Sequence, residues 1–169
     1  MKGIHVLGSV VITVGCGIIG TIKARELRRA ISEIGDVMYA VRIIRAELAF
    51  HMTPVYVLCE IVSQRIGGEI GCLFKTCLMY TSDRSFSEQW YETVSGCRLI
   101  AGKSIQEELA RMGDFFGRYD VEEQLASFDL MYDRLLRLQS EAEARYEQNG
   151  KLYRNVGISV GLMLGILFL

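Results

Sequence analysis

Side chains that could perform chemistry are few in this chain, and they lie far apart in the sequence. It has two histidines and five cysteines, with no Cys-x-x-Cys pair. The cysteines are Cys16, Cys59, Cys72, Cys77 and Cys97. His51 with Cys72 and Cys77 would combine metal-ligating types, but this spacing matches no structural zinc pattern. We therefore predict no metal site, and we expect buried, reduced thiols.

The sequence also gives little indication of acid-base catalysis or of nucleotide binding. Glu107-Glu108 and Glu122-Glu123 are carboxylate pairs, but each is expected in the first turn of a helix, where the helix dipole stabilises negative charge. His51 is expected to interact with the dipole at a helix C-terminus. No phosphate-binding or dinucleotide-binding glycine motif occurs. We predict no catalytic residue, no cofactor and no small-molecule substrate, and therefore a protein that is not an enzyme.

Composition places the apolar excess at the two ends of the chain. The formal net charge of −1 gives no general attraction to nucleic acid, which is not an expected partner. Residues 4–22 carry no charge apart from His5, which is expected at the membrane interface, and as a helix they would be about 28 Å long, near the thickness of a bilayer core. Basic residues follow at Lys23, Arg25, Arg28 and Arg29, which places this side of the segment in the cytoplasm. The apolar run continues past Cys16, so we expect neither cleavage nor lipidation there.

The tail, residues 156–169, is a second uncharged segment. Gly157, Gly161 and Gly165 recur at every fourth position, which on a helix gives a bare stripe that allows close approach of another helix in lipid. A complementary stripe of small residues lies in the first segment, at Ser9, Thr13, Gly17 and Thr21. At about 21 Å the tail is short, a length that also suits a buried core helix. Its stripe could equally contact another subunit.

Helical periodicity and helix-stop signals organise the region between these segments. Apolar residues repeat every seven positions from Leu27 to Leu48, and Thr53-Pro54 predicts a new helix with Thr53 as its cap. Short helices are expected from Val55 to about Ile66 and from Ile70 to about Thr81. Two capping patterns, Ser85-x-x-Glu88 and Ser104-x-x-Glu107, open further ones. Trp90 is expected in the core and Tyr91 at its rim.

The last helix is predicted to begin after Asp120 and to lead into the tail, with Asn149-Gly150 as a point of bending. From residue 103 to 149 there are eleven acids against six bases, whereas residues 23–45 carry six bases against three acids. Two long helices are therefore expected to face each other with complementary charge. The predicted fold is an all-α antiparallel bundle of about six helices. Its domains are a transmembrane segment at 1–22, a cytoplasmic bundle at 23–155 and a transmembrane segment at 156–169.

Three motifs, in order along the chain, resemble the stage III sporulation protein AB family. Residues 45–54 read Arg-Ala-Glu-Leu-Ala-Phe-His-Met-Thr-Pro, and a paired-glycine segment at 109–117 is followed by Asp120-x-x-x-Gln124. Residues 151–157, Lys-Leu-Tyr-Arg-Asn-Val-Gly, precede the glycine-rich end. Residues 55–57, Val-Tyr-Val, depart from the pattern by lacking a second proline and an acidic residue.

The resemblance implies a helical cytoplasmic domain similar to the F-type platform domains of type II secretion systems. It implies a scaffold in the mother-cell membrane around the forespore, within a secretion-like channel complex that joins the two compartments. The implied partners are a secretion-type ATPase of the same complex (stage III sporulation protein AA), other membrane subunits and the lipid bilayer. The alternative is a two-span regulatory or signalling protein whose helical domain binds another ligand.

Overall fold

The computed structural model describes residues 2–79, 84–116 and 120–150, with the single residues 159 and 163. The described residues form six α-helices and no strand, which confirms the predicted all-α class. The helices are α1 (Lys2–His51), α2 (Val55–Arg65), α3 (Gly68–Met79), α4 (Phe86–Gly96), α5 (Lys103–Phe115) and α6 (Val121–Arg145). A π-helical turn, η1 (Tyr146–Gly150), follows α6.

Two compact units are distinguished, residues 1–29 with 141–169, and residues 30–140. Within the described part of the chain, none of the helices combines the length and the apolar character that a membrane crossing requires. The predicted tail segment, 156–169, lies outside the described residues except for 159 and 163. The structure describes the backbone of residues 2–20 but not their side chains, and so not those of Ser9, Thr13 and Gly17 in the first small-residue stripe. The two membrane segments therefore remain predictions. The π-helical turn includes Asn149-Gly150, the predicted point of bending.

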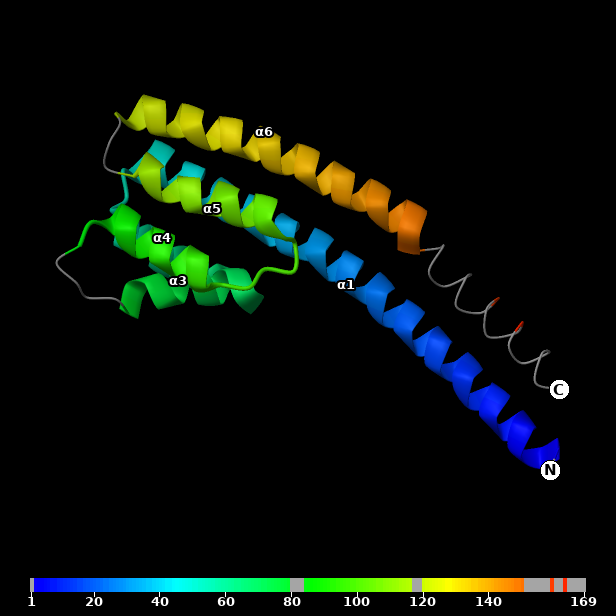
Figure 1. The fold of residues 1–169 in the computed structure, drawn as a ribbon. Coiled ribbons are helices and arrows are strands. Elements are labelled where there is room, and N and C mark those ends of the chain that lie inside the picture. The colour runs from blue at the N-terminus through cyan, green and yellow to red at the C-terminus, as the bar shows by residue number, and fades with distance from the viewer. Residues whose placement is uncertain (1, 80–83, 117–119, 151–158, 160–162, 164–169) are drawn as a thin grey trace. The chain divides into compact units, whose positions relative to one another are not determined.

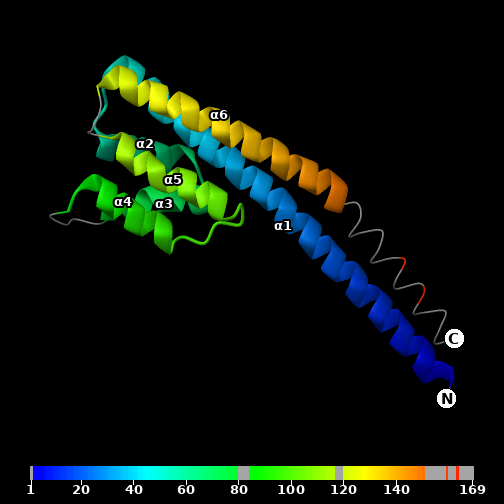
Figure 2. The same cartoon turned by 45° about the horizontal axis from the view of Figure 1, so that its top comes forward.

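The core of unit 30–140 is built around the apolar seam of α1. The heptad repeat predicted for this helix corresponds to a buried face that includes Ile34, Val41 and Leu48. Opposite it lie the buried residues Phe128, Met131 and Leu135 of α6, and others from the helices between them. Figures 1 and 2 show α2, α3, α4 and α5 gathered beside the C-terminal half of α1. Burial of these apolar faces is the main driving force for the bundle.

Within this unit, α1 and α6 run antiparallel, side by side in both views (Figures 1 and 2). The Arg45 guanidinium lies 2.7 Å from a carboxylate oxygen of Asp129, and further along, a Cβ on Gly35 would lie 3.9 Å from Nε2 of Gln139. The first contact is the predicted kind of charge complementarity between the long helices. Both side chains are about half exposed, so the ion pair contributes little to stability.

The connection between α1 and α2 differs from the prediction at Thr53. Pro54 is the N-cap residue of α2 and has no side-chain acceptor, so α2 has no side-chain capping bond. Thr53 lies one position before the cap, and its hydroxyl donates to Glu47 over 3.4 Å. Just before it, Met52 adopts a left-handed conformation with φ of 47°, the one non-glycine residue of the described chain to do so. The corner therefore reverses the chain by backbone geometry, without a side-chain cap.

The α3–α4 and α4–α5 connections also test predicted caps. Ser85 caps α4 as predicted, accepting a hydrogen bond from the Glu88 backbone N–H at 3.4 Å. The predicted cap Ser104 is wrong, because α5 begins at Lys103 and its N-cap is Gly102, with φ of 93°. A positive φ at this position favours glycine over serine, so backbone conformation decides where α5 begins.

A buried carboxylate holds the α4–α5 connection against α1. The Glu33 side chain is buried and accepts a hydrogen bond from the Ala101 backbone N–H at 2.6 Å. Burial raises the pKa of Glu33, although hydrogen bonds from the backbone of residues 100 and 101 partly oppose this shift. Asp36, which lies near Glu33, also has its pKa raised by burial. Folding therefore favours the protonated form of both groups.

This environment predicts a pH-dependent stability. A carboxyl whose pKa is higher in the folded than in the unfolded state stabilises the fold most below its unfolded pKa, and this contribution is lost as pH rises through the folded pKa. Glu33→Gln keeps an acceptor for Ala101 and removes the titration. We expect the variant to show a shallower decline in unfolding free energy from pH 4.5 upward than the unmodified protein. Urea denaturation at a series of pH values measures this, and identical slopes would contradict it.

Candidate functional site

The cysteines and histidine singled out in the sequence do not converge. Cys59 and Cys77 are buried, free thiols, and the Cys59 thiol is hydrogen-bonded to Cys77. This bond, together with burial, raises the pKa of Cys59 far above its usual value. Cys72 is exposed, which corrects the expectation that the thiols are buried, and His51 lies 3.4 Å from Glu47 at the end of α1. Among the described residues, no three potential ligands form a metal-binding group.

The two carboxylate pairs have different environments. Glu122 and Glu123 lie in the first turn of α6, as predicted. The prediction for Glu107 and Glu108 is wrong, because α5 begins at Lys103 and its first turn contains no acid. Glu108 is instead buried and pairs with Arg111 at 3.2 Å and with Arg134 of α6 at 3.6 Å. It therefore joins α5 to α6.

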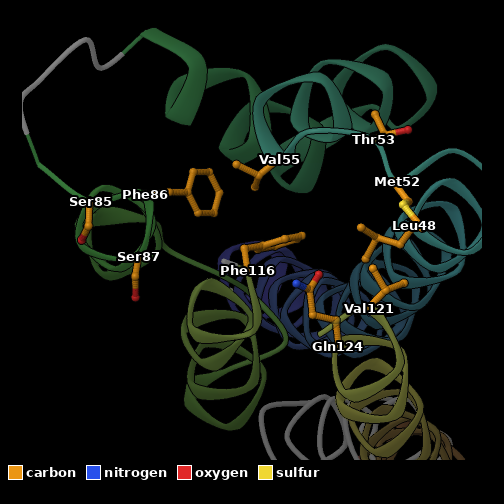
Figure 3. Close-up of a pocket in the computed structure, with 10 residues that line it drawn as sticks. All are labelled: Leu48, Met52, Thr53, Val55, Ser85, Phe86, Ser87, Phe116, Val121 and Gln124. Atoms are coloured by element: carbon orange, nitrogen blue, oxygen red, sulfur yellow. The ribbon is translucent and has the colours of Figure 1, made fainter. Parts of the chain in front are cut away.

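A groove of about 540 Å³ lies where α1 turns into α2, within unit 30–140. Four parts of the chain contribute to it: the α1–α2 corner, the start of α4, the end of α5 and the start of α6. Its lining residues are Leu48, Met52, Thr53, Val55, Ser85, Phe86, Ser87, Phe116, Val121 and Gln124. Figure 3 shows Val55, Phe86 and Phe116 pointing toward one another across the space between their elements.

Aromatic rings connect the floor of the groove to the core. Phe86 contacts Phe116 edge-on at a centroid separation of 5.5 Å, and Phe116 contacts the buried Phe128 at 5.4 Å. Phe86 also lies 6.0 Å from Trp90 and 5.6 Å from Tyr56. Offset and edge-to-face contacts of this kind add to the stabilisation from burial. The buried rings of Trp90 and Phe128 therefore support Phe86 and Phe116, the two phenylalanines that line the groove.

The outer margin of the groove is apolar and open to solvent. Four large apolar residues in the eight positions around the α1–α2 corner are exposed: Phe50 (81%), Met52 (74%), Tyr56 (45%) and Val57 (43%). Met52 also lines the groove, and the Tyr56 ring contacts Phe86, so these two residues extend its apolar surface to solvent. Single exposed apolar residues are ordinary, but a group of them beside a groove is typical of an interaction surface.

Charged groups border the groove unevenly. On the α5–α6 side, Asp114 accepts a hydrogen bond from the lining residue Ser87 at 2.8 Å, and Asp120 accepts one from the backbone N–H of Val121 at 2.8 Å. On the α1 side, Glu47 lies 3.4 Å from His51 and 3.9 Å from Arg65. The α5–α6 side of the groove therefore presents two carboxylates, Asp114 and Asp120. On the α1 side, the carboxylate of Glu47 already lies near the basic side chains of His51 and Arg65.

Sequence reasoning did not locate this groove, although it singled out several of its parts. The segment 45–54 contributes Leu48, Met52 and Thr53, and the predicted start of the last helix contributes Val121 and Gln124. The signal that could have indicated a surface was the apolar sequence on both sides of Thr53-Pro54, where a chain reversal leaves side chains little room for burial.

Comparison with known proteins places this arrangement in a family. The family model described as "Stage III sporulation protein AB (spore_III_AB)" matches residues 5–169. The chain belongs to the stage III sporulation protein AB family. It is therefore a sporulation protein, as the resemblance in the sequence implied. No curated protein matches the chain.

A solved structure supports the fold of this family member. The structure titled "Stage III sporulation protein AB (SpoIIIAB)" aligns with a TM-score of 0.61 at 18% sequence identity. The alignment covers 70% of this chain and 96% of that one. At this identity the likeness establishes a shared fold.

Proposed function

We propose that this protein is a non-enzymatic membrane platform of a sporulation-specific, secretion-like complex, and that its helical bundle docks a cytoplasmic secretion-type ATPase. The observation that carries the proposal is the apolar groove with its exposed margin at the α1–α2 corner. A helical bundle with a solvent-exposed apolar surface is suited to binding another protein. Family membership supports a role in sporulation.

In this proposal the chain is held in the mother-cell membrane around the forespore. The support is the sequence of its two ends, residues 4–22 and 156–169, which are uncharged apart from His5. The basic residues after the first segment favour a cytoplasmic bundle. The proposed first anchor and the first helix of the bundle belong to one element, the 50-residue helix α1.

Co-purification from sporulating cells tests the docking proposal. We expect detergent-extracted full-length protein to retain the secretion-type ATPase, and the double variant Met52→Ser/Tyr56→Ser to retain at least about tenfold less, because Met52 lines the groove, the Tyr56 ring contacts Phe86 and both side chains are exposed. Quantitative immunoblotting of the ATPase measures this. The matched control is Met79→Ser/Leu130→Ser, which removes exposed apolar residues outside the groove. Equal ATPase recovery with all three proteins, or none with any, would contradict the proposal.

A further inference from the structure

The groove at the α1–α2 corner offers apolar contacts and few free polar groups. Six of its ten lining residues are apolar. The hydroxyls of Thr53 and Ser87 donate to Glu47 and Asp114, and the Ser85 hydroxyl accepts from the backbone of Glu88. Gln124, the remaining polar lining residue, is engaged as well. A ligand that needs many hydrogen bonds from the protein would leave polar groups unpaired here, at a substantial cost.

Backbone geometry also restricts the occupant. The lining residues belong to helices α1, α2, α4 and α6, or lie next to a helix end, and the described part of the unit contains no strand. An extended peptide gains affinity chiefly by adding to a sheet edge, which is absent from the described residues here. A helical segment satisfies its own backbone hydrogen bonds and inserts apolar side chains at i, i+3, i+4 and i+7. The groove therefore suits a helix that presents apolar residues on one face.

The negative charge beside the groove indicates which charge the polar face of that helix should carry. Residues 114–123 carry four acids (Asp114, Asp120, Glu122 and Glu123) against one base, Arg118. Among the described residues, none of these four acids forms an ion pair with a basic side chain. Complementary charge across an interface steers association and suppresses wrong partners.

We propose that the groove binds an amphipathic helix whose apolar face fills the space between Val55, Phe86 and Phe116 and whose flanks carry Lys or Arg. In this arrangement the basic flank lies along the α5–α6 side, beside Asp114 and Asp120. The inference deepens the proposed function, on which it rests, by stating which chemistry the docked ATPase must present. It also assigns the docking position to the α1–α2 corner.

Site-specific photocrosslinking of the full-length protein in sporulating cells tests the position and the chemistry together. Benzoylphenylalanine replaces Tyr56, whose ring contacts Phe86, and in a matched control it replaces Tyr91, which is 60% exposed on α4 and does not line the groove. Mass spectrometry of the crosslinked peptides identifies the bound segment. We expect position 56 to crosslink at least about tenfold more than position 91. The segment should have apolar residues at helical spacing and flanking Lys or Arg.

A charge test is made on the same crosslink. Asp114→Asn with Asp120→Asn keeps the hydrogen-bond acceptors for Ser87 and Val121 but removes two negative charges. We expect the crosslink yield to fall about three- to tenfold, in line with the modest strength of exposed charge pairs. The control, Asp133→Asn with Glu143→Gln, removes two exposed charges elsewhere on α6 and should leave the yield unchanged.

The outcomes separate this inference from the proposed function. A basic amphipathic helix from a protein other than the ATPase would support the groove assignment and contradict ATPase docking. ATPase recovery without a crosslink from position 56 above position 91 would contradict the groove assignment and leave ATPase docking standing. A crosslink to lipid or to an acidic segment, or a yield insensitive to the Asp114 and Asp120 changes, would overturn the proposed chemistry.

Discussion

Gly71→Ala is expected to destabilise the bundle by about 3 kcal/mol or more, the upper range for forcing an atom into a packed site. A Cβ at this position would lie 1.9 Å from the carbonyl oxygen of Ile66 and 2.8 Å from its carbon. Both atoms belong to the backbone of the tight turn between α2 and α3, so no side-chain rotation relieves the overlap. Either α3 moves or the turn opens, and both change the packing of the buried residues Leu73 and Phe74.

Gly67→Ala is the matched control in the same turn. A Cβ on Gly67 meets nothing within 4 Å, and the residue does not have a positive φ. We expect its unfolding free energy to stay within about 1 kcal/mol of the unmodified protein, with a small gain from reduced freedom of the unfolded chain. Guanidinium denaturation followed by circular dichroism measures both variants. Equal midpoints for Gly71→Ala and Gly67→Ala would show that the α2–α3 turn adapts.

Gly113→Ala is expected to cost about 2–3 kcal/mol, because it forces the chain's single tryptophan out of position. A Cβ on Gly113 would lie 2.6 Å from Cδ1 of Trp90 and 3.2 Å from its Cβ. The Trp90 side chain is fully buried, and its Nε1 donates to the carbonyl oxygen of Leu109 at 2.5 Å. Displacing the indole would weaken this hydrogen bond and the ring contact with Phe74 at 4.9 Å.

The single tryptophan provides the measurement. Its fluorescence should shift to longer wavelength in Gly113→Ala and the denaturation midpoint should fall. Gly96→Ala is the control, because this glycine also lies in a helix, α4, and a Cβ there meets nothing within 4 Å. Replacing glycine by alanine in a helix is favourable by itself, so the control should be as stable as the unmodified protein or slightly more stable. A Gly113→Ala variant with native fluorescence would contradict the close α4–α5 contact.

Local sequence patterns predicted the helices because each depends on neighbours along the chain. The seven-residue repeat from Leu27 to Leu48 indicated the buried face of α1, and Ser85 with Glu88 indicated the start of α4. Asp120 indicated the start of α6 in the same way. Hydrophobic periodicity and capping act over a few residues, so one sequence is sufficient to recognise them.

Features that depend on tertiary contacts or on backbone conformation could not be predicted in this way. Ser104 has the residue type of a cap, but a positive φ at Gly102 lets α5 begin two residues earlier. Because of this shift, Glu108 lies beyond the first turn of α5. It pairs there with Arg134 from α6. Thr53 similarly bonds to Glu47 instead of capping α2. In these cases backbone conformation or a side-chain contact that the helix pattern does not encode decided the outcome.

The groove itself is the clearest example of a feature that only folding creates. Phe86 and Phe116 lie thirty positions apart in the sequence, and their ring contact requires α4 and α5 to be packed already. Nothing in either local sequence indicates that these two rings would share a surface with Met52 and Val55. Sequence analysis therefore predicted the elements that carry the site, but it did not predict the site.

Because four separate segments build the groove, an unfolded chain has no partial copy of it. A partner that occupies the groove must therefore bind the native state alone, and mass action then adds its binding energy to the stability of the bundle. At a free partner concentration one hundred times the Kd, this contribution is about 2.7 kcal/mol. Such a gain is comparable to the expected loss from Gly113→Ala. Occupancy of the groove would thus protect the bundle from unfolding and proteolysis, and assembly would select for subunits that have completed folding.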